Sequence, residues 1–186
     1  MTKYSLNNMS TNNLDLTEII ETFPDFPKKG ILFRDVNPVF RRYEALSYIS
    51  REFCDQLRTY TIDYIIGIES RGFIVATALA MAMGKGLILI RKAGKLPGQT
   101  LKQPYDVEYG NSIMEVQKDS IRQGQSVLIA DDLVATGGTA IAAERLVSQL
   151  GGKVVGFAFV VELANLGGAT KIRELGYDVC SLVVYD

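Results

Sequence analysis

Histidine is absent from this chain of 186 residues. Its absence excludes Ser–His and Cys–His nucleophilic catalysis and every metal site with histidine ligands. A general base must therefore be a carboxylate, a lysine, a tyrosine or a cysteine. Any bound metal is expected to be a hard cation with oxygen ligands, such as Mg²⁺ carried in by a phosphorylated substrate.

Cysteines, long apolar runs and excess charge are also scarce. Cys54 and Cys180 are the only cysteines and lack zinc-ligand spacing, so we expect two reduced thiols in a cytoplasmic protein. The polar start of the chain lacks the apolar core of a secretory signal, and no apolar run approaches the roughly 20 residues of a membrane span. With 20 Lys and Arg against 21 Asp and Glu, the charge balance favours neither nucleic acid nor a membrane as partner.

The chain length suits one domain, and most of it alternates between apolar strands and helices. Strands that lack a polar face and are joined by helices are typical of a parallel sheet covered on both faces. We expect strands at Tyr64–Glu69, Leu87–Ile90, Ser126–Asp132, Val154–Val161 and Val179–Tyr185, with a short extended piece at Leu32–Val36. We expect helices at Asp15–Thr22, Arg42–Arg58, Arg71–Met83, Thr139–Leu150 and Ala169–Leu175.

One long segment, Arg91–Ile121, interrupts this alternation. Its first part contains Gly94, Pro97 and Gly98 and shows no helical pattern. Because such long connections in compact domains are usually functional lids or disordered, we expect an irregular lid here. Glu108 lies within it, and a carboxylate in a closing lid can act as a general acid or base. An exposed glutamate without a role is the alternative.

The segment Val127–Thr139, VLIADDLVATGGT, carries the most distinctive pattern. Asp131 and Asp132 end an apolar run, and paired acids at the carboxyl end of a parallel strand face the ligand crevice. The two glycines that follow let the backbone approach an anion, two threonines supply hydroxyl donors, and the next helix begins with free N–H groups. The segment thus offers acceptors for two vicinal hydroxyls and a nest for one phosphate, which are the features of ribose 5-phosphate. It matches neither a Walker A loop nor a Rossmann fingerprint.

Cations gather after two of the predicted strands. Arg71 follows the first strand in the segment ESRGF, and Arg91, Lys92 and Lys95 follow the second in RKAGKLPG. Guanidinium groups match phosphate oxygens, so both segments suit a diphosphate. Taken singly, each is equally explained by solvated surface charge.

Together these segments resemble the adenine phosphoribosyltransferases of the type I phosphoribosyltransferase family. The resemblance runs from about Phe23 to Tyr185 and rests on GILFRD, ESRGF, RKAGKLPG, ADDLVATGGT and VEL, in that order. It implies a central parallel sheet flanked by helices, with a small N-terminal hood over about 14–40, a core over about 41–186 and a flexible catalytic loop over about 95–117. Residues 1–13 lie outside it and are expected to form a flexible extension.

The resemblance also implies roles for individual residues. Asp131 and Asp132 would bind the ribose hydroxyls of 5-phospho-α-D-ribose 1-diphosphate (PRPP), directly or through Mg²⁺. The 5′-phosphate would be bound by Ala135, Thr136, Gly137, Gly138 and Thr139, and the diphosphate by Ser70, Arg71, Arg91, Lys92 and Lys95, the last from its own or a neighbouring subunit. A cis peptide is implied at Glu69–Ser70. Adenine would lie among Leu32, Phe33, Arg34 and Leu163, and Glu108 would transfer a proton of the base while Tyr105 and Tyr109 shield the reaction centre.

The implied activity is the transfer of phosphoribose from PRPP to adenine, giving AMP and diphosphate, by a homodimer that uses Mg²⁺. A related enzyme for a 6-oxopurine such as xanthine or guanine is the nearest alternative, because sequence does not show the backbone polarity at Leu32–Arg34. A PRPP-sensing regulator without activity is a second alternative. It would need an added binding module or a basic face, and the sequence shows neither.

Overall fold

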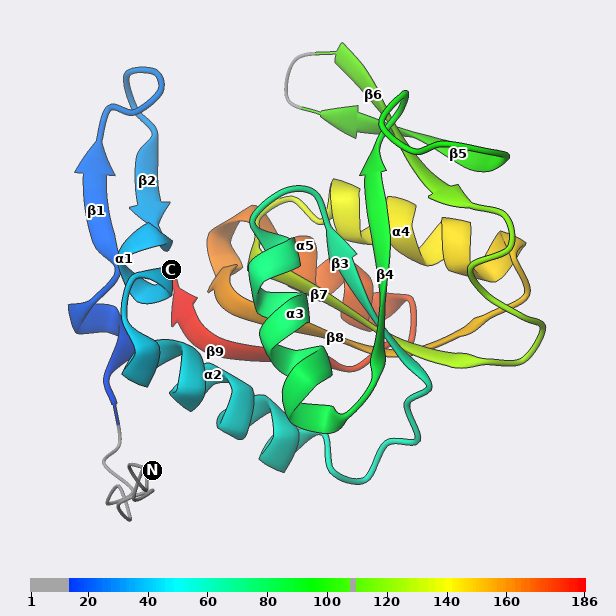
Figure 1. The fold of residues 1–186 in the computed structure, drawn as a ribbon. Coiled ribbons are helices and arrows are strands. Elements are labelled where there is room, and N and C mark those ends of the chain that lie inside the picture. The colour runs from blue at the N-terminus through cyan, green and yellow to red at the C-terminus, as the bar shows by residue number, and fades with distance from the viewer. Residues whose placement is uncertain (1–13, 108–109) are drawn as a thin grey trace, which may run out of the picture.

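A seven-stranded sheet forms the centre of the computed structural model, which describes residues 14–107 and 110–186. Its strand order is β5-β6-β4-β3-β7-β8-β9 (Figure 1). The parallel strands are β3 (Tyr64–Ile68), β4 (Gly86–Lys92), β7 (Ser126–Val134), β8 (Lys153–Leu163) and β9 (Val179–Tyr185). The antiparallel strands β5 (Thr100–Val107) and β6 (Gly110–Gln117) extend the sheet at the β4 edge. The predicted parallel sheet is confirmed, with this antiparallel addition.

Helices cover both faces of the sheet. Neighbouring residues of a strand point to opposite sides, so an apolar strand presents apolar side chains on both faces that need covering. Ile65 of β3 packs into one core cluster with residues of α2 (Tyr43–Gln56) and α3 (Gly72–Met83). Ile66 packs into the other cluster, with residues of α4 (Gly138–Gln149) and α5 (Gly168–Glu174). Figure 1 shows α3 in front of the sheet and α4 behind it. The apolar strands are therefore buried from both sides, as their lack of polar residues predicts.

The segment predicted as a hood contains two short helices and a hairpin. The 3₁₀ turn η1 (Leu16–Glu18) is followed by β1 (Glu21–Pro24), β2 (Leu32–Asp35) and helix α1 (Asn37–Phe40). β1 and β2 pair as a separate antiparallel hairpin, called here the N-terminal hairpin, which stands beside the main sheet at the left of Figure 1. The helix predicted at Asp15–Thr22 is therefore wrong beyond its first turn, because Glu21–Pro24 hydrogen-bonds across to β2 instead of continuing the helix.

The lid expected over Arg91–Ile121 also differs from the prediction of an irregular segment. β5 and β6 form a hairpin, and β6 joins the sheet through the pairs Arg91↔Glu115 and Lys92↔Met114. Met114 and Val116 of β6 are fully buried, so apolar packing in the core stabilises this strand. Residues 1–13, predicted as an extension, and Glu108 and Tyr109, predicted in the lid, lie outside the described residues.

Both cysteines are free, and the Cys180 thiol donates a hydrogen bond to Gln56 Oε1 at 2.8 Å. Burial raises the pKa of this thiol to about 11. Across residues 14–107 and 110–186, none of the helices is both long and apolar enough to cross a membrane.

Candidate active site

The predicted ribose-phosphate segment forms a strand, a short loop and the start of a helix. β7 continues to Val134, two residues beyond the predicted end, so the aspartate pair lies inside the strand. α4 begins at Gly138, one residue before the predicted start. Gly137 immediately precedes it with φ of 83°, a left-handed conformation that favours glycine over residues with a side chain. The backbone N–H groups of the first turn of α4 thus border the loop, as a phosphate nest requires.

The aspartate pair is deeply buried. Asp131 is 8% exposed and Asp132 is 5% exposed. Asp131 Oδ1 accepts a hydrogen bond from the Asp132 N–H at 2.9 Å and lies against Gly72, where an added Cβ would come within 2.4 Å of it. Burial, with the neighbouring Asp132 charge, raises the pKa of Asp131 well above its usual value. Burial also raises the pKa of Asp132, although the Arg71 charge opposes this. The pair therefore favours binding of partners that stabilise its ionised form, such as hydroxyl donors or a cation.

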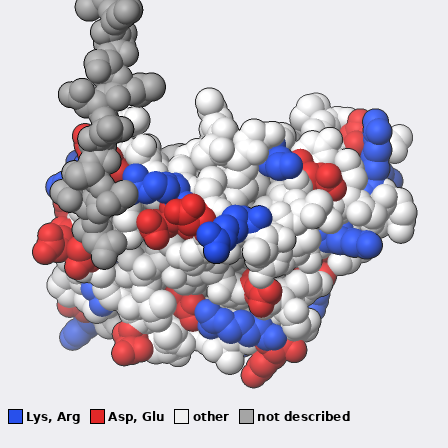
Figure 2. Space-filling model, turned by 90° about the horizontal axis from the view of Figure 1, so that it is seen from below, with Lys and Arg blue, Asp and Glu red and all other residues white. Residues whose placement is uncertain are grey.

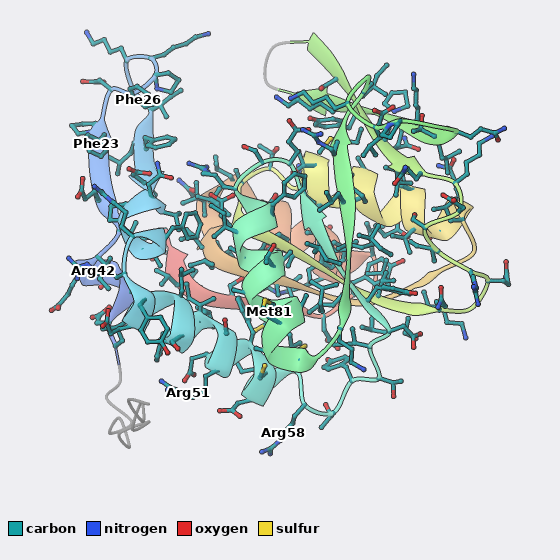
Figure 3. The ribbon with its side chains drawn as sticks, viewed as in Figure 1. Phe23, Phe26, Arg42, Arg51, Arg58 and Met81 are labelled. Carbon is teal, nitrogen blue, oxygen red and sulfur yellow. The ribbon has the colours of Figure 1, made fainter. Side chains whose placement is uncertain are left out.

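Arg71 links this pair to the N-terminal hairpin. Its Nε lies 2.7 Å from Asp132 Oδ2, yet that oxygen has no hydrogen-bond partner among the described residues, so the contact is an ion pair with poor hydrogen-bond alignment. The Arg71 guanidinium also lies 5.8 Å from the centre of the Phe33 ring. Phe33 packs edge-to-face on Phe26, at 5.1 Å between ring centres, and Figure 3 shows Phe26 near the tip of the hairpin. Residues predicted to bind sugar, diphosphate and base thus meet around one side chain.

The predicted diphosphate segments converge on another acid, Glu69, whose side chain is 8% exposed. The implied cis peptide at Glu69–Ser70 is present. Glu69 Oε2 accepts hydrogen bonds from Arg91 Nε at 3.3 Å and from the Lys92 N–H at 3.0 Å, and Glu69 Oε1 is paired with the Lys95 ammonium. Burial by itself would raise the pKa of Glu69, but the Lys95 and Lys92 hydrogen bonds and the Arg91 charge hold it below its usual value. Glu69 is the first residue of the ESRGF motif, but no role was predicted for it from the sequence.

Glu115 on β6 is a supporting residue that sequence reasoning missed. Its side chain is buried, and Oε1 accepts hydrogen bonds from the N–H groups of Lys95 at 2.8 Å and Leu96 at 3.0 Å. Oε2 accepts one from the Thr100 hydroxyl at 3.1 Å. Burial would raise the pKa of Glu115, but these bonds keep it low. One carboxylate therefore shapes the turn that carries Lys95, and a lone acid between buried Met114 and Val116 was the available signal.

The residues predicted around the base lie on the N-terminal hairpin and at the end of β8. The Arg34 guanidinium lies 3.9 Å from the centre of the Tyr185 ring and donates a hydrogen bond to the Thr22 hydroxyl at 2.6 Å. Tyr185 pairs in register with Leu163, which is half-buried. Leu32 is 50% exposed. The Arg34 side chain thus fastens the hairpin to the sheet beside Leu163.

Glu162, next to Leu163, is also fastened. It is buried and makes a two-pronged ion pair with Arg173, with both N–O distances at 2.9 Å. Ser181 adds a hydrogen bond to Glu162 Oε2 at 2.7 Å. Hydrogen bonds from Arg173, working against burial, lower the pKa of Glu162. Its charge is neutralised within the protein, which fixes the end of β8 and leaves Leu163 as the residue available to a ligand.

A glycine that the sequence analysis did not select supports the phosphate loop from behind. The Gly168 N–H donates to the Ala135 carbonyl at 2.9 Å. A Cβ at Gly168 would come within 2.3 Å of that oxygen and 2.5 Å of the Gly137 nitrogen. Lys171, one turn later, donates to the Thr136 carbonyl at 3.4 Å. The pair Gly167–Gly168 at the start of a helix was the available signal.

The predicted lid residues are only partly placed. Tyr105 on β5 is half-buried and packs against the core cluster that contains α4. Glu108 and Tyr109, the predicted proton-transfer residue and its neighbour, lie outside the described residues, so their roles stay predictions. No cluster of three or more metal-ligating side chains occurs in the described part of the chain.

Comparison with known proteins gives a consistent result. The model of the phosphoribosyl transferase domain matches residues 43–183. Adenine phosphoribosyltransferase of Cenarchaeum symbiosum is 52% identical over 172 residues, which cover 92% of this chain and 100% of the relative. The crystal structure of the enzyme of that name from Thermoanaerobacter pseudethanolicus superposes with a TM-score of 0.87 at 42% identity, covering 91% of this chain and 98% of that one.

A third similar protein was solved with ligands. The Saccharomyces cerevisiae adenine phosphoribosyltransferase, complexed with adenine and an imino-altritol bisphosphate, has a TM-score of 0.83 at 41% identity, covering 90% of this chain and 96% of that one. The matched family domain spans both the aspartate pair and the cationic segment described above. The chain therefore belongs to the phosphoribosyltransferase family, and within it groups with the adenine phosphoribosyltransferases.

Proposed function

We propose that this protein transfers the phosphoribosyl group of PRPP to adenine, giving AMP and diphosphate. The observation that carries the proposal is the position of Arg71, which contacts Asp132 and lies over Phe33. A single guanidinium thus borders the predicted sites for the sugar, the diphosphate and the base. The yeast relative, solved with adenine and a sugar-like bisphosphate, supports this choice of ligands.

Each ligand group has a matching part of the site. The ribose hydroxyls donate to the buried carboxylates of Asp131 and Asp132, and Asp132 Oδ2, which lacks a hydrogen-bond partner among the described residues, gains one. The 5′-phosphate binds the backbone N–H groups from Ala135 to Thr139 at the start of α4. The diphosphate binds Ser70 and the cations Arg71, Arg91, Lys92 and Lys95. Adenine lies against Phe33 and the backbone of Leu32 and Arg34, with Leu163 on its other face.

In the reaction, a bond forms between adenine N9 and the anomeric carbon as the bond from that carbon to the diphosphate oxygen breaks. Positive charge develops on the sugar and negative charge on the leaving diphosphate, and fixed cations stabilise the latter. Glu108 accepts the proton that the base must lose. Tyr105 and Tyr109 exclude water, and the site contributes by holding the two substrates in line.

Magnesium is proposed as the cofactor, bound chiefly through the substrate. Mg²⁺ prefers oxygen ligands, and the buried Oδ2 of Asp132, which has the Arg71 ion pair but no hydrogen-bond partner among the described residues, fits that preference. When bound, the ion would neutralise part of the diphosphate charge. Asp131 and Asp132 would hold it or one of its waters.

A homodimer is the proposed assembly. Ile74 and Met81 lie two turns apart on α3 and are 41% and 79% exposed. Leu87 and Leu89 on the adjoining β4 are each 36% exposed. Figure 3 shows Met81 on the α3 side of the molecule. This apolar surface supports contact between two copies. Sedimentation of the native chain beside a variant with Ile74→Glu and Met81→Lys should show a dimer and a monomer, respectively.

We also propose that the protein works in the cytoplasm without a nucleic acid partner. Two free cysteines fit a reducing compartment. On the face drawn in Figure 2, Lys and Arg side chains are interspersed with Asp and Glu rather than forming a basic stripe. Binding to labelled duplex DNA and single-stranded RNA at low salt tests this, and tight binding that weakens steeply with salt would contradict it.

A panel of bases tests the proposed activity. Adenine, hypoxanthine, guanine, xanthine and orotate are each incubated with PRPP and Mg²⁺, and diphosphate release is measured. We expect release with adenine and little with the others. Preference for a 6-oxopurine would refute the adenine assignment, and no release with any base would favour a PRPP-binding regulator.

A variant tests the role of Glu108. Glu108→Ala should leave PRPP binding nearly unchanged while turnover falls by about 10²–10⁴-fold, the usual contribution of general acid–base catalysis. Full turnover in this variant would remove Glu108 from the mechanism.

A further inference from the structure

Glu69 is an acid with a largely buried side chain that the proposed mechanism leaves without a role. It lies at the end of β3, where the phosphate-binding cations gather, and its side chain is 8% exposed. A negative charge at that place opposes binding of an anion such as diphosphate, because like charges repel strongly in a partly dehydrated site. Its presence therefore needs a physical reason.

The two oxygens of Glu69 have different partners. Oε2 accepts from Arg91 Nε and from the Lys92 backbone N–H, at 3.3 and 3.0 Å, which ties β4 to the end of β3. Oε1 is paired with the ammonium of Lys95, whose side chain is 48% exposed. Arg91 also donates to the Lys95 carbonyl at 3.1 Å. Oε2 thus stabilises the packing of β4 against β3, whereas Oε1 pairs with the ammonium of a long side chain at the surface.

The backbone N–H of Lys95 is held by Glu115, independently of Glu69. Glu115 Oε1 holds the N–H groups of Lys95 and Leu96 at 2.8 and 3.0 Å. The turn therefore stays in place if the Lys95 ammonium leaves Glu69. Because a lysine side chain is flexible and exposed on one side, its ammonium can swing from one anion to another at little cost.

We propose that Glu69 is an internal counter-ion that holds the Lys95 ammonium in the free protein and yields it to the diphosphate group when substrate or product binds. Glu69 is thus a positioning residue that lowers diphosphate affinity and eases release of that product. The inference rests on the proposed role of Lys95 in binding diphosphate.

The chain offers a selective variant. In Glu69→Gln, the amide oxygen can keep the two N–H donors of Arg91 and Lys92, which places the amide NH₂ group against Lys95. Two donors do not attract each other, so Lys95 is released while the contacts within the fold are kept. The matched control is Glu115→Gln, which also removes a buried negative charge. Glu115 accepts a hydrogen bond from the backbone N–H of Lys95, and no contact of Glu115 with the Lys95 ammonium is found among the described residues. Its three hydrogen bonds can survive, because an amide NH₂ can donate to the Thr100 hydroxyl.

The experiment measures binding of inorganic diphosphate with excess Mg²⁺ by calorimetry. It uses the native chain, the variants Glu69→Gln, Lys95→Ala and Glu115→Gln, and the double variant of Glu69 and Lys95. Unfolding temperatures check that each is folded. Glu69→Gln should bind diphosphate roughly two- to fivefold more tightly, the range expected for freeing a partly exposed ion pair. Lys95→Ala should bind it at least about fivefold more weakly, as loss of a hydrogen bond to a charged group predicts.

The double variant decides between a specific and a general effect. We expect Glu69→Gln to tighten binding much less in the Lys95→Ala background than in the native chain, because its main effect is to free Lys95, and we expect Glu115→Gln to bind like the native chain. Equal tightening in both backgrounds would show only the removal of a repelling charge and would overturn the inference. Weaker or unchanged binding by Glu69→Gln, or equal tightening by Glu115→Gln, would overturn the inference while leaving the proposed function intact. Unchanged binding by Lys95→Ala would instead show that the proposed role of Lys95 is wrong, and the inference with it.

Discussion

Substitution of Gly168 by alanine tests whether the phosphate loop depends on the segment behind it. The added Cβ would lie 2.3 Å from the Ala135 oxygen, 2.5 Å from the Gly137 nitrogen and 2.7 Å from the Thr136 carbonyl carbon. All three atoms are backbone, so no side chain can rotate away. Gly168 is not among the glycines with positive φ, and it begins helix α5, where alanine is the better helix former. Any loss of stability or of PRPP affinity in Gly168→Ala must therefore come from the collision of the added Cβ with the loop backbone.

The size of the effect follows from packing energetics. Adding a methyl group to a filled region costs about 1–3 kcal/mol. If displacement of the loop from Ala135 to Gly137 absorbs this cost, PRPP affinity falls by roughly 5- to 150-fold. The Lys171 contact with the Thr136 carbonyl would be lost with it.

The assay is calorimetric titration of PRPP with Mg²⁺, together with the KM values for both substrates. We expect the KM for PRPP to rise and the KM for adenine to stay nearly constant. Gly156→Ala in β8 is the matched control, because its Cβ would meet nothing closer than the Asp178 carbonyl at 3.3 Å. A folded Gly168→Ala protein with native PRPP affinity would refute the role of this segment.

Three further predictions follow from the buried acids and the N-terminal hairpin. Because burial raises the pKa of Asp131 well above its usual value, PRPP affinity should rise as pH rises toward and through that pKa, and binding below it should release a proton in calorimetry. The same shift lowers folding stability as pH rises above the usual aspartate value, so Asp131→Asn should weaken this fall of the unfolding temperature with pH. A native PRPP affinity that does not change with pH would contradict the first statement, and an unaltered pH profile of unfolding in the variant would contradict the second. Glu115→Ala leaves the N–H groups of Lys95 and Leu96 without this acceptor and should lower the free energy of unfolding by about 1–3 kcal/mol, seen as a lower unfolding temperature. An unchanged unfolding temperature would show that Glu115 does not stabilise this turn. Phe33→Ala should raise the KM for adenine roughly tenfold or more with little change for PRPP, whereas equal changes in both would place Phe33 elsewhere.

The sequence predicted the fold where local pattern and core burial agree. The parallel strands, the helices α2 to α5 and the phosphate loop all appear, with ends shifted by one to a few residues. The segment Arg91–Ile121 shows the limit of this approach. Its glycines and prolines suggested an irregular lid, whereas the described part pairs β5 with β6 and β6 with β4, and such pairing depends on a distant strand.

The sequence by itself was enough to predict a ribose-phosphate site, because the parts of that site are contiguous. An apolar strand, two acids, two glycines and a helix start act on a ligand through backbone geometry within 13 residues, from Val127 to Thr139. Such a motif needs no distant partner to be recognised.

Only the tertiary structure decided how distant charges and rings combine. It places Arg71 between Asp132 and Phe33, gathers Arg91, Lys92 and Lys95 around Glu69, and presses Gly168 against the back of the phosphate loop. These contacts join residues from 22 positions apart, Arg91 and Glu69, to 61 positions apart, Arg71 and Asp132, and they arise from the order of strands in the sheet. Composition and local spacing do not encode that order, so each residue taken alone was equally well explained as a surface charge, a phenylalanine of an edge strand or an ordinary glycine.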